Sequence, residues 1–239
     1  PNSDLLNTNK QIMAETDNPL DKDHGLIALV IGATGATGKD LVKQLLADED
    51  FKEIKIFVRR KSGIQHSKLI EHIVDFEKWT EWESQIRGDV AFSCLGTTLK
   101  SAGSKEAQKR IDMDYQYEFA RIARNNHVPT FVLVSAFGAS SQSRIFYSRI
   151  KGELEDKIKM LNFPHCIFFQ PGMLDRPQSD RFFEVWGLKA LRLLNQIGIF
   201  KSQKPLPTPT LAKAMIKSSK FPIDGIQVYR LGEIFGIGS

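Results

Sequence analysis

The feature that most constrains this chain is a glycine-rich turn at residues 32–38, Gly-Ala-Thr-Gly-Ala-Thr-Gly. Residues 26–31 before it form an unbroken apolar run, too short for a helix and typical of a strand buried on both faces. After it, apolar residues recur at helical spacing between positions 41 and 46. A buried strand, a glycine-rich turn and an amphipathic helix in this order predict a site where N–H groups at a helix N-terminus bind a pyrophosphate.

Gly32, Gly35 and Gly38 suit such a site because they have no Cβ. They allow a tight turn, close approach of a phosphate to the backbone and close packing of helix on strand. Their spacing differs from the Gly-x-Gly-x-x-Gly form, and the Gly-Lys-Ser/Thr ending of a nucleoside-triphosphate loop is missing. The alternative interpretation is a turn that merely tolerates glycine.

The alternation of strand and helix continues along the chain. Short apolar segments at 54–58, 69–74, 90–93, 130–135 and 166–169 predict strands, and segments at about 105–126 and 144–161 predict helices. Strands that alternate with helices form parallel βαβ units with right-handed crossovers. The predicted fold class is therefore α/β, a Rossmann-type doubly wound parallel sheet.

The two ends of the chain do not show this alternation of strand and helix. Residues 1–24 are polar and lack the features of a secretory signal, so we expect a flexible N-terminal arm. Residues 25–239 are expected to form one NAD(P)-binding domain, in which 173–239 is a C-terminal substrate or lid segment over the carboxyl edge of the sheet. That segment contains a helix at about 181–199, a proline-rich loop at 204–209, a helix at about 211–219 and a final strand at about 226–229.

Composition and charge exclude several classes of protein. The 33 Lys and Arg are interspersed with 28 Asp and Glu, which indicates solvated helix faces and no nucleic-acid site. No apolar run approaches the ~18 residues of a membrane span, so we expect no membrane partner. Cys94 and Cys166 are far apart and the five His are scattered, which predicts free thiols, no metal site and a cytoplasmic location.

Arg59 and Arg60 end the strand expected at 54–58, and they bear on the choice of cofactor. An NAD site has an acid at this place to accept from the ribose 2′-OH, whereas Arg accommodates a 2′-phosphate. No acid occurs between positions 54 and 62. Guanidinium groups bind phosphate in bidentate fashion, so the sequence favours NADP(H). The alternative is that both residues only end a strand at the surface.

Tyr147 and Lys151 lie four residues apart in the helix expected at 144–161, so they share one face. A nearby ammonium lowers the pKa of a phenol from its reference value of ~10 and makes it a usable acid or base. Ser135, at the end of the fifth strand, is a candidate to hydrogen-bond the same substrate oxygen. The three residues predict a catalytic set for a carbonyl or alcohol.

Together the turn, the Ser135, Tyr147 and Lys151 set, and the Pro171-Gly172 pair after a strand resemble the short-chain dehydrogenase/reductase superfamily over residues 26–239. Within it the chain is most similar to the atypical Tat-interacting-protein-like oxidoreductase branch. That finer resemblance is carried by five segments, at residues 59–61, 74–77, 94–98, 112–115 and 147–153.

The resemblance implies roles for the matching residues. Tyr147 would donate the proton, and Lys151 would also contact the nicotinamide ribose. The remaining implied cofactor contacts are Gly32, Thr34, Gly35, Ala36, Thr37 and Gly38 at the pyrophosphate, Arg59 and Arg60 at the 2′-phosphate, Asp75 and Phe76 at the adenine, Cys94, Leu95 and Gly96 beneath the adenosine, and Pro171, Gly172 and Met173 at the nicotinamide. Asp112 departs from the resemblance, because many relatives carry Asn there, and it puts the usual proton-relay water in doubt.

Three functions fit these observations. The first is an NADPH-dependent oxidoreductase that reduces a small carbonyl compound by hydride transfer. The others are an NADPH-sensing binding protein without turnover and a protein similar to nucleotide-sugar epimerases, although the segment after Pro171 is short for the latter. The residues Met173, Phe182, Phe183, Trp186 and Leu188 predict either an apolar substrate cavity or ordinary lid core. The oligomeric state stays open, with a homodimer as one option that the resemblance implies.

Overall fold

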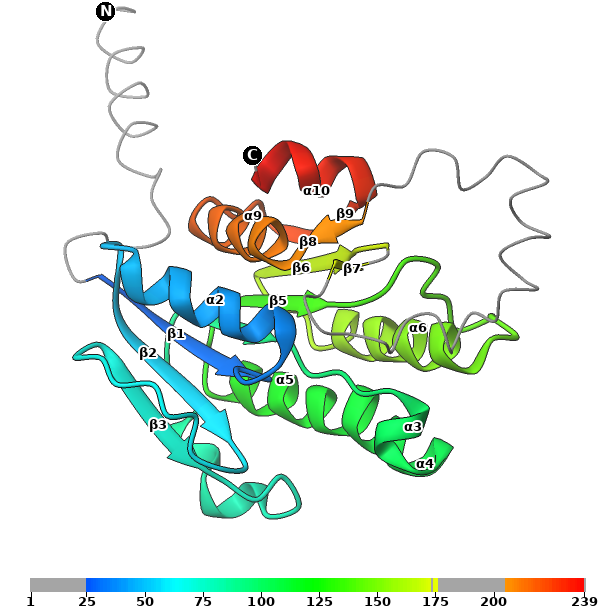
Figure 1. Ribbon diagram of the computed structural model, residues 1–239, viewed down its shortest axis with the longest axis horizontal. Helices are drawn as coiled ribbons and strands as arrows, with labels where there is room; N and C mark the ends of the chain where they lie inside the picture. The colour runs from blue at the N-terminus through cyan, green and yellow to red at the C-terminus, as the bar shows by residue number, and fades with distance from the viewer. Residues whose placement is uncertain (1–24, 173, 176–204, 239) are drawn as a thin grey trace, which may run out of the picture.

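The computed structural model describes residues 25–172, 174–175 and 205–238, and it is built on a seven-stranded sheet whose neighbouring strands are all parallel (Figure 1). Across the sheet the order is β3 (Leu69–Ile73), β2 (Phe51–Val58), β1 (Leu26–Ile31), β4 (Val90–Ser93), β5 (Thr130–Val134), β6 (His165–Gln170) and β9 (Gly225–Arg230). The chain runs outward from β1 to β3 and then returns to β4 on the other side of β1. Ligands of open α/β sheets bind at such a switch point, outside the carboxyl ends of the strands.

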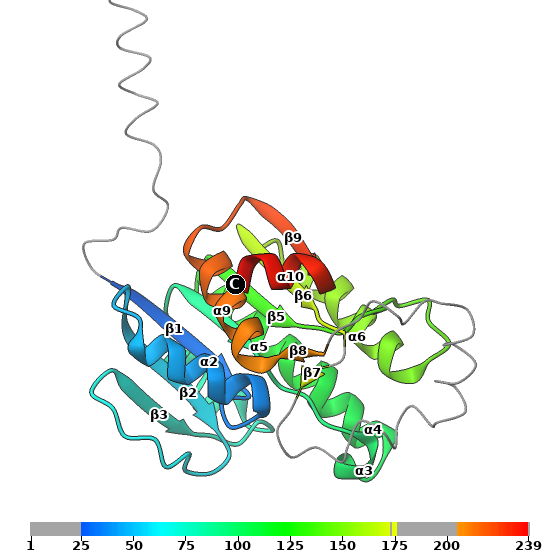
Figure 2. The same ribbon diagram turned by 45° about the horizontal axis from the view of Figure 1, so that its top comes forward.

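Helices cover both faces of the sheet. On one face lie α2 (Ala36–Ala47), α9 (Thr208–Lys220) and α10 (Leu231–Gly238), which are above the sheet in Figure 1 and in front of it in Figure 2. On the other face lie α5 (Tyr115–Asn125) and α6 (Phe146–Lys159). Because both faces are covered, the central strands are apolar in successive positions, as the sequence indicated. The predicted doubly wound α/β fold is confirmed.

The helix expected at 105–126 is divided into three parts. It begins as α4 (Lys105–Lys109) after a short α3 (Leu99–Ala102), continues as the π-helical segment η4 (Arg110–Asp114) and ends as α5. A π-helical turn holds one extra residue and is common at functional sites. Here it carries Asp112 and packs against α6. Two short 3₁₀ turns, η2 (Trp79–Glu81) and η3 (Glu83–Gln85), lie between β3 and β4.

The described part of the C-terminal segment is not the lid that we expected. β9 pairs with β6 over its whole length, from the pair His165 and Gly225 to the pair Gln170 and Arg230, so it extends the sheet. The apolar side of α9 packs against α2, and α10, which the sequence pattern did not predict, packs on α9. Apolar residues of both helices thus complete the core on the α2 face instead of covering an edge.

Several sequence predictions fall on residues that the structure does not describe. They are the arm at 1–24, the helix at about 181–199 and the apolar residues Met173, Phe182, Phe183, Trp186 and Leu188. On either side of that gap, β7 (Leu174–Asp175) pairs in parallel with β8 (Leu206–Pro207).

Candidate functional site

The turn between β1 and α2 requires glycine at two positions. Gly32 has a φ of +77°, and a Cβ on it would lie 2.4 Å from the carbonyl carbon of Cys94. A Cβ on Gly38 would lie 2.0 Å from the carbonyl oxygen of Gly32. Both distances are far below any normal contact, so the turn exists only because these residues lack side chains.

The N-terminus of α2 is open to a ligand. Gly35 precedes the helix, no side chain caps its first N–H groups, and no acid lies in its first turn. Thr34, Gly35 and Ala36 are exposed, whereas Thr37 is buried beneath them. Unpaired N–H groups at the positive end of a helix dipole suit an anion, so this turn fits the pyrophosphate of a dinucleotide.

Arg59 and Arg60 follow β2 and are exposed at the same edge of the sheet. The Arg59 guanidinium acts electrostatically on the hydroxyl of Tyr115, so Arg59 lies near the start of α5. Burial and a hydrogen bond to Glu77 nevertheless raise the pKa of Tyr115 to about 12, and this phenol therefore stays neutral. The two Arg can reach an anion here without a carboxylate of their own segment competing for them.

Asp75 and Phe76, expected at the adenine, have different surroundings. Asp75 is exposed, and its Oδ1 accepts from the N–H of Glu77 at 2.9 Å. Phe76 is buried and stacks on Tyr115 with 5.3 Å between ring centres. Asp75 is thus free to face a ligand, whereas the Phe76 ring belongs to an aromatic cluster beneath it, with Trp79, Trp82 and Tyr115.

Cys94, Leu95 and Gly96 follow β4 and form the wall beside the turn. The backbone N–H of Cys94 donates to the carbonyl of Ile31 at 3.0 Å, which holds this wall against β1. Burial raises the pKa of the Cys94 thiol to about 12, against the opposite effect of the Lys151 ammonium. The thiol is neutral at physiological pH, so Cys94 contributes its backbone and its bulk rather than reactivity.

Tyr147 and Lys151 lie in the first half of α6, and the structure brings them together. The Lys151 ammonium is 6.0 Å from the centre of the Tyr147 ring. Lys151 is almost completely buried, whereas Tyr147 is 37% exposed. A buried cation therefore lies behind a phenol that can reach a ligand, which is the arrangement that the spacing predicted.

Lys151 has a charged partner that the sequence did not predict. Its Nζ lies 3.5 Å from Oδ1 of Asp112, and both side chains are at most 1% exposed. The other carboxylate oxygen of Asp112 accepts from the N–H of Thr97 at 3.1 Å. Burial raises the pKa of Asp112, while Lys151 and the Thr97 N–H oppose that change. The departure noted at Asp112 is thus a direct ion pair with the lysine.

The hydroxyl of Ser135 has a partner that the sequence did not predict. It is buried, and its hydroxyl donates to Glu155. Gln170 donates to both carboxylate oxygens of Glu155, at 2.9 and 3.0 Å, and accepts from Nε of Arg230 at 3.0 Å. The hydroxyl of Ser135 is thus part of a buried network, because a buried carboxylate needs donors. Its predicted hydrogen bond to a substrate oxygen stays a prediction. Glu155 lies four residues after Lys151, so helical spacing was a signal that could have found it.

Pro171 and Gly172 follow β6 at the carboxyl edge, as expected for residues beside the nicotinamide. Pro171 is buried, and its carbonyl accepts from the N–H of Phe137 at 2.9 Å. This bond ties the end of β6 to the loop after β5. Met173, the third residue of the set, lies outside the described residues.

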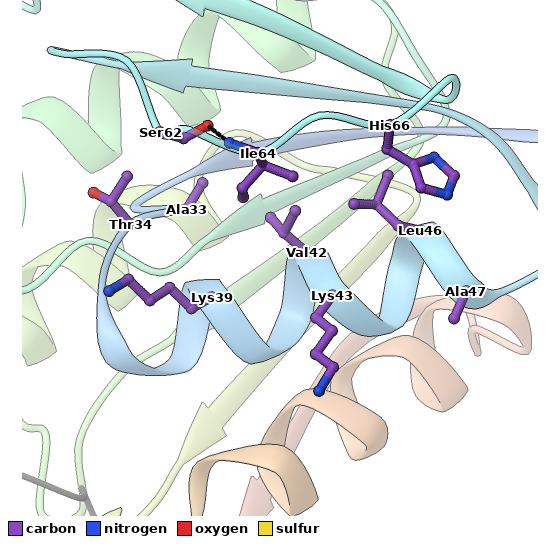
Figure 3. A pocket seen from close by; sticks show the side chains of 10 residues that line it. All are labelled: Ala33, Thr34, Lys39, Val42, Lys43, Leu46, Ala47, Ser62, Ile64 and His66. Atoms are coloured by element: carbon purple, nitrogen blue, oxygen red, sulfur yellow. Dashed lines mark hydrogen bonds between the residues drawn. The ribbon is translucent and has the colours of Figure 1, made fainter.

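A cavity of about 500 Å³ lies between α2 and the loop after β2 (Figure 3). Val42 and Leu46 point toward Ile64, whereas the Lys43 ammonium points away from it. Ala33 and Thr34 of the turn form one end of the cavity. No residue of α6 lines it, so it is distinct from the region of Tyr147.

Two kinds of feature are absent from the described ranges 25–172, 174–175 and 205–238. No helix there is both long enough and apolar enough to cross a membrane. Within the same ranges, no three His, Cys, Asp or Glu residues gather where they could hold a metal ion.

Known proteins resemble this chain in sequence and in fold. A family model described as NAD(P)H-binding matches residues 32–163. Protein HTATIP2 of Rattus norvegicus is 36% identical over 156 residues, which cover 63% of this chain and 64% of that protein. The mitochondrial protein FMP52 of Meyerozyma guilliermondii is 35% identical over 200 residues, 82% of this chain and 86% of its own length.

The fold is also that of solved structures. A short-chain dehydrogenase/reductase superfamily protein of Agrobacterium tumefaciens with bound NAD has a TM-score of 0.64. It is 12% identical and covers 86% of this chain and 77% of its own. The resemblance to this superfamily and to its Tat-interacting-protein-like branch is confirmed by these matches.

The expected cytoplasmic location is wrong by the same comparisons. The FMP52 relatives of Meyerozyma guilliermondii, Lodderomyces elongisporus and Candida albicans are named as mitochondrial proteins. Our expectation rested on the low cysteine content, which indicates a reducing environment but does not distinguish one reducing compartment from another.

Proposed function

Because this chain belongs to the NAD(P)H-binding family of atypical short-chain dehydrogenase/reductases, in the branch of HTATIP2 and FMP52, we propose that it is an NADPH-dependent oxidoreductase that reduces a small carbonyl compound. The observation that carries the proposal is the pair in α6. A phenol that is 37% exposed lies in front of an almost completely buried ammonium, 6.0 Å from the ring centre. An exposed phenol beside a cation is suited to exchange a proton with a ligand.

The choice of NADPH over NADH rests on Arg59 and Arg60. Both side chains are exposed at the end of β2, on the side of the turn where the ribose of the adenosine would lie. No acid occurs in the segment to accept from a ribose hydroxyl. Two guanidinium groups in that place favour a cofactor with a 2′-phosphate.

The bound cofactor would supply the hydride that the carbonyl carbon gains. Tyr147 donates its phenolic proton to the carbonyl oxygen, which yields an alcohol, and the resulting phenolate takes a proton from solvent. The N–H groups of α2 would hold the pyrophosphate, and the wall at Cys94 and Leu95 would lie beside the adenosine. The cation at Lys151 stabilises the phenolate while it exists.

We propose a mitochondrial location for the protein. The names of its FMP52 relatives support it, and two of these relatives each match 82% of this chain. Fractionation of cells that express the full-length natural protein, with immunodetection in the mitochondrial fraction, tests the location.

A second candidate is an NADPH-binding protein that senses the cofactor without turnover. The observation that favours it is Ser135, whose hydroxyl is engaged with Glu155. Tyr147 would then have no second hydroxyl to help it hold a substrate oxygen. A measurement of NADPH oxidation distinguishes the two candidates, because only the oxidoreductase consumes NADPH.

The test is the variant Tyr147→Phe. We expect NADPH oxidation, measured with a panel of aldehydes and ketones, to fall at least ~100-fold, while NADPH affinity changes little. Tyr117→Phe is the matched control, since Tyr117 also has a lysine near its ring, Lys157 at 5.2 Å, but lies on α5. Unchanged turnover in Tyr147→Phe contradicts the proposed role, and no turnover by the wild type across the panel favours the sensor.

A further inference from the structure

We propose that Asp112 is a positioning residue that neutralises Lys151, so that Tyr147 stays protonated at neutral pH and donates a proton to a carbonyl more readily than it takes one from an alcohol. The direction of the reaction rests on the proposed function, whereas the electrostatic effect of Asp112 on Tyr147 does not.

The carboxylate and the ammonium form an isolated buried pair. They are 3.5 Å apart, and neither side chain is more than 1% exposed. At this depth water screens charges poorly, so the effect of one partner on the charge of the other is strong. Lys151 without Asp112 would act on Tyr147 as a full positive charge; with Asp112 it acts as one end of a dipole.

The position of Asp112 is fixed by the backbone around it. It lies in the middle of η4, where the π-helical turn packs against α6. The N–H of Thr97 donates to Oδ2, and the side-chain amide of Gln116 donates to the main-chain carbonyl of Asp112 at 2.7 Å. The amide oxygen of Gln116 in turn accepts from Ser93 at 2.8 Å. The carboxylate is thus held in place by β4, the loop after it and α5.

Few other charges act on the lysine. Directly after β4, the Cys94 thiol lies near the lysine but stays neutral, because burial raises its pKa to about 12. On α6, the next titratable group along the same face is Glu155, whose carboxylate accepts hydrogen bonds from Ser135 and Gln170. Arg149 points toward the Phe146 ring and Glu153. Within the described residues, Asp112 is the one carboxylate paired with Lys151.

Lys105 and the backbone of η4 complete the surroundings. Lys105, on α4, lies over the Phe146 ring at 5.6 Å, at the start of α6. Asp114, at the end of η4, is exposed and forms no ion pair that the described residues show. The Asp114 carboxylate thus lies on the same π-helical segment as Asp112 but is not buried beside Lys151.

The consequence for Tyr147 follows from the sign of the charges. An unopposed cation favours phenolate and lowers the pKa of Tyr147 below its reference value of ~10. A carboxylate beside that cation removes most of this effect. At pH 7 the small fraction of phenolate then falls about tenfold for each pH unit by which the midpoint rises. This favours the neutral phenol, which reduction of a carbonyl needs, over the phenolate, which oxidation of an alcohol needs as base.

The experiment is a titration of tyrosinate absorbance in the whole protein without substrate. The chain has four Tyr, so the difference between a protein and the same protein with Tyr147→Phe isolates Tyr147. We expect a wild-type midpoint near pH ~10, and in Asp112→Asn a midpoint lower by at least about one pH unit. Asp114→Asn, which removes an exposed carboxylate from the same segment, is the matched control and leaves the midpoint unchanged.

The outcomes separate the inference from the proposed function. A midpoint in Asp112→Asn that equals or exceeds that of the wild type overturns the inference. A wild-type midpoint below ~8.5 also overturns it, and that measurement does not depend on whether Asp112→Asn folds. If the shift occurs but no carbonyl compound is reduced, only the proposed function fails. If reduction occurs, its pH profile moves to lower pH in Asp112→Asn, and an unmoved profile overturns the inference alone.

Discussion

The two halves of the site are built by different means. The cofactor half, at the turn between β1 and α2, depends on side chains that are missing, because Gly32 and Gly38 leave no space for a Cβ. The half that we propose transfers a proton, at α6 and η4, depends on charges that are buried, because Lys151 and Asp112 are at most 1% exposed. The first is a property of one short segment, whereas the second exists only when two distant segments pack together.

The variant Gly38→Val is expected to have the largest effect on the cofactor half. Its Cβ would lie 2.0 Å from the carbonyl oxygen of Gly32, and backbone cannot yield as a flexible side chain can. We expect at least about 3 kcal/mol of destabilisation in urea unfolding and loss of measurable NADPH binding. Gly63→Ala is the control: its φ is +78° but a Cβ there meets nothing within 4 Å, so it costs about 1–2 kcal/mol. Equal losses for the two variants contradict the steric explanation.

The choice of cofactor is the next largest effect. In the double variant Arg59→Ala with Arg60→Ala, affinity for NADPH is expected to fall about 10- to 100-fold more than affinity for NADH, since charge-assisted bonds to the 2′-phosphate are lost. Fluorescence titration with each cofactor measures the ratio. Lys213→Ala with Lys217→Ala removes two exposed cations from α9 and leaves the ratio unchanged. A double Arg variant that loses both cofactors equally shows that the 2′-phosphate is not recognised there.

The smallest effect concerns Ser135. We expect Ser135→Ala to lower the free energy of unfolding by about 1–3 kcal/mol, because Glu155 loses one of its donors in a buried network. We expect turnover, measured as NADPH oxidation, to fall less than ~10-fold in this variant. Urea unfolding of Ser135→Ala beside Ser67→Ala, an exposed serine, measures the difference. A ~100-fold loss of turnover with unchanged stability would place Ser135 back among the catalytic residues.

The difference between the two halves also explains what the sequence could predict. The turn, the strands and the pair at Tyr147 and Lys151 follow from local spacing, and the structure has them where the pattern indicated. The ion pair at Asp112 joins residues 39 positions apart and depends on a π-helical turn for which no sequence pattern is specific. The same is true of the contact between Ser135 and Glu155, which only the packing of α6 on β5 creates.

The helix α10 is a second element that local sequence patterns do not predict. α10 has the sequence Leu-Gly-Glu-Ile-Phe-Gly-Ile-Gly, in which three glycines oppose a helix. It forms because Ile234 is buried in the core and α10 packs on α9, so packing outweighs propensity. No local rule predicts this.

The pairing of β9 with β6 has a consequence for how the molecule assembles. Partner residues such as Gln170 and Arg230 are 60 positions apart, and closing so long a loop is slow compared with forming the neighbouring βαβ units. We therefore expect the edge formed by β9 to join the sheet late in folding. Until it does, Gln170 lacks its bond from Arg230, and we expect the network of Gln170 and Glu155 in the half that contains Tyr147 to become rigid only in the last stage of folding.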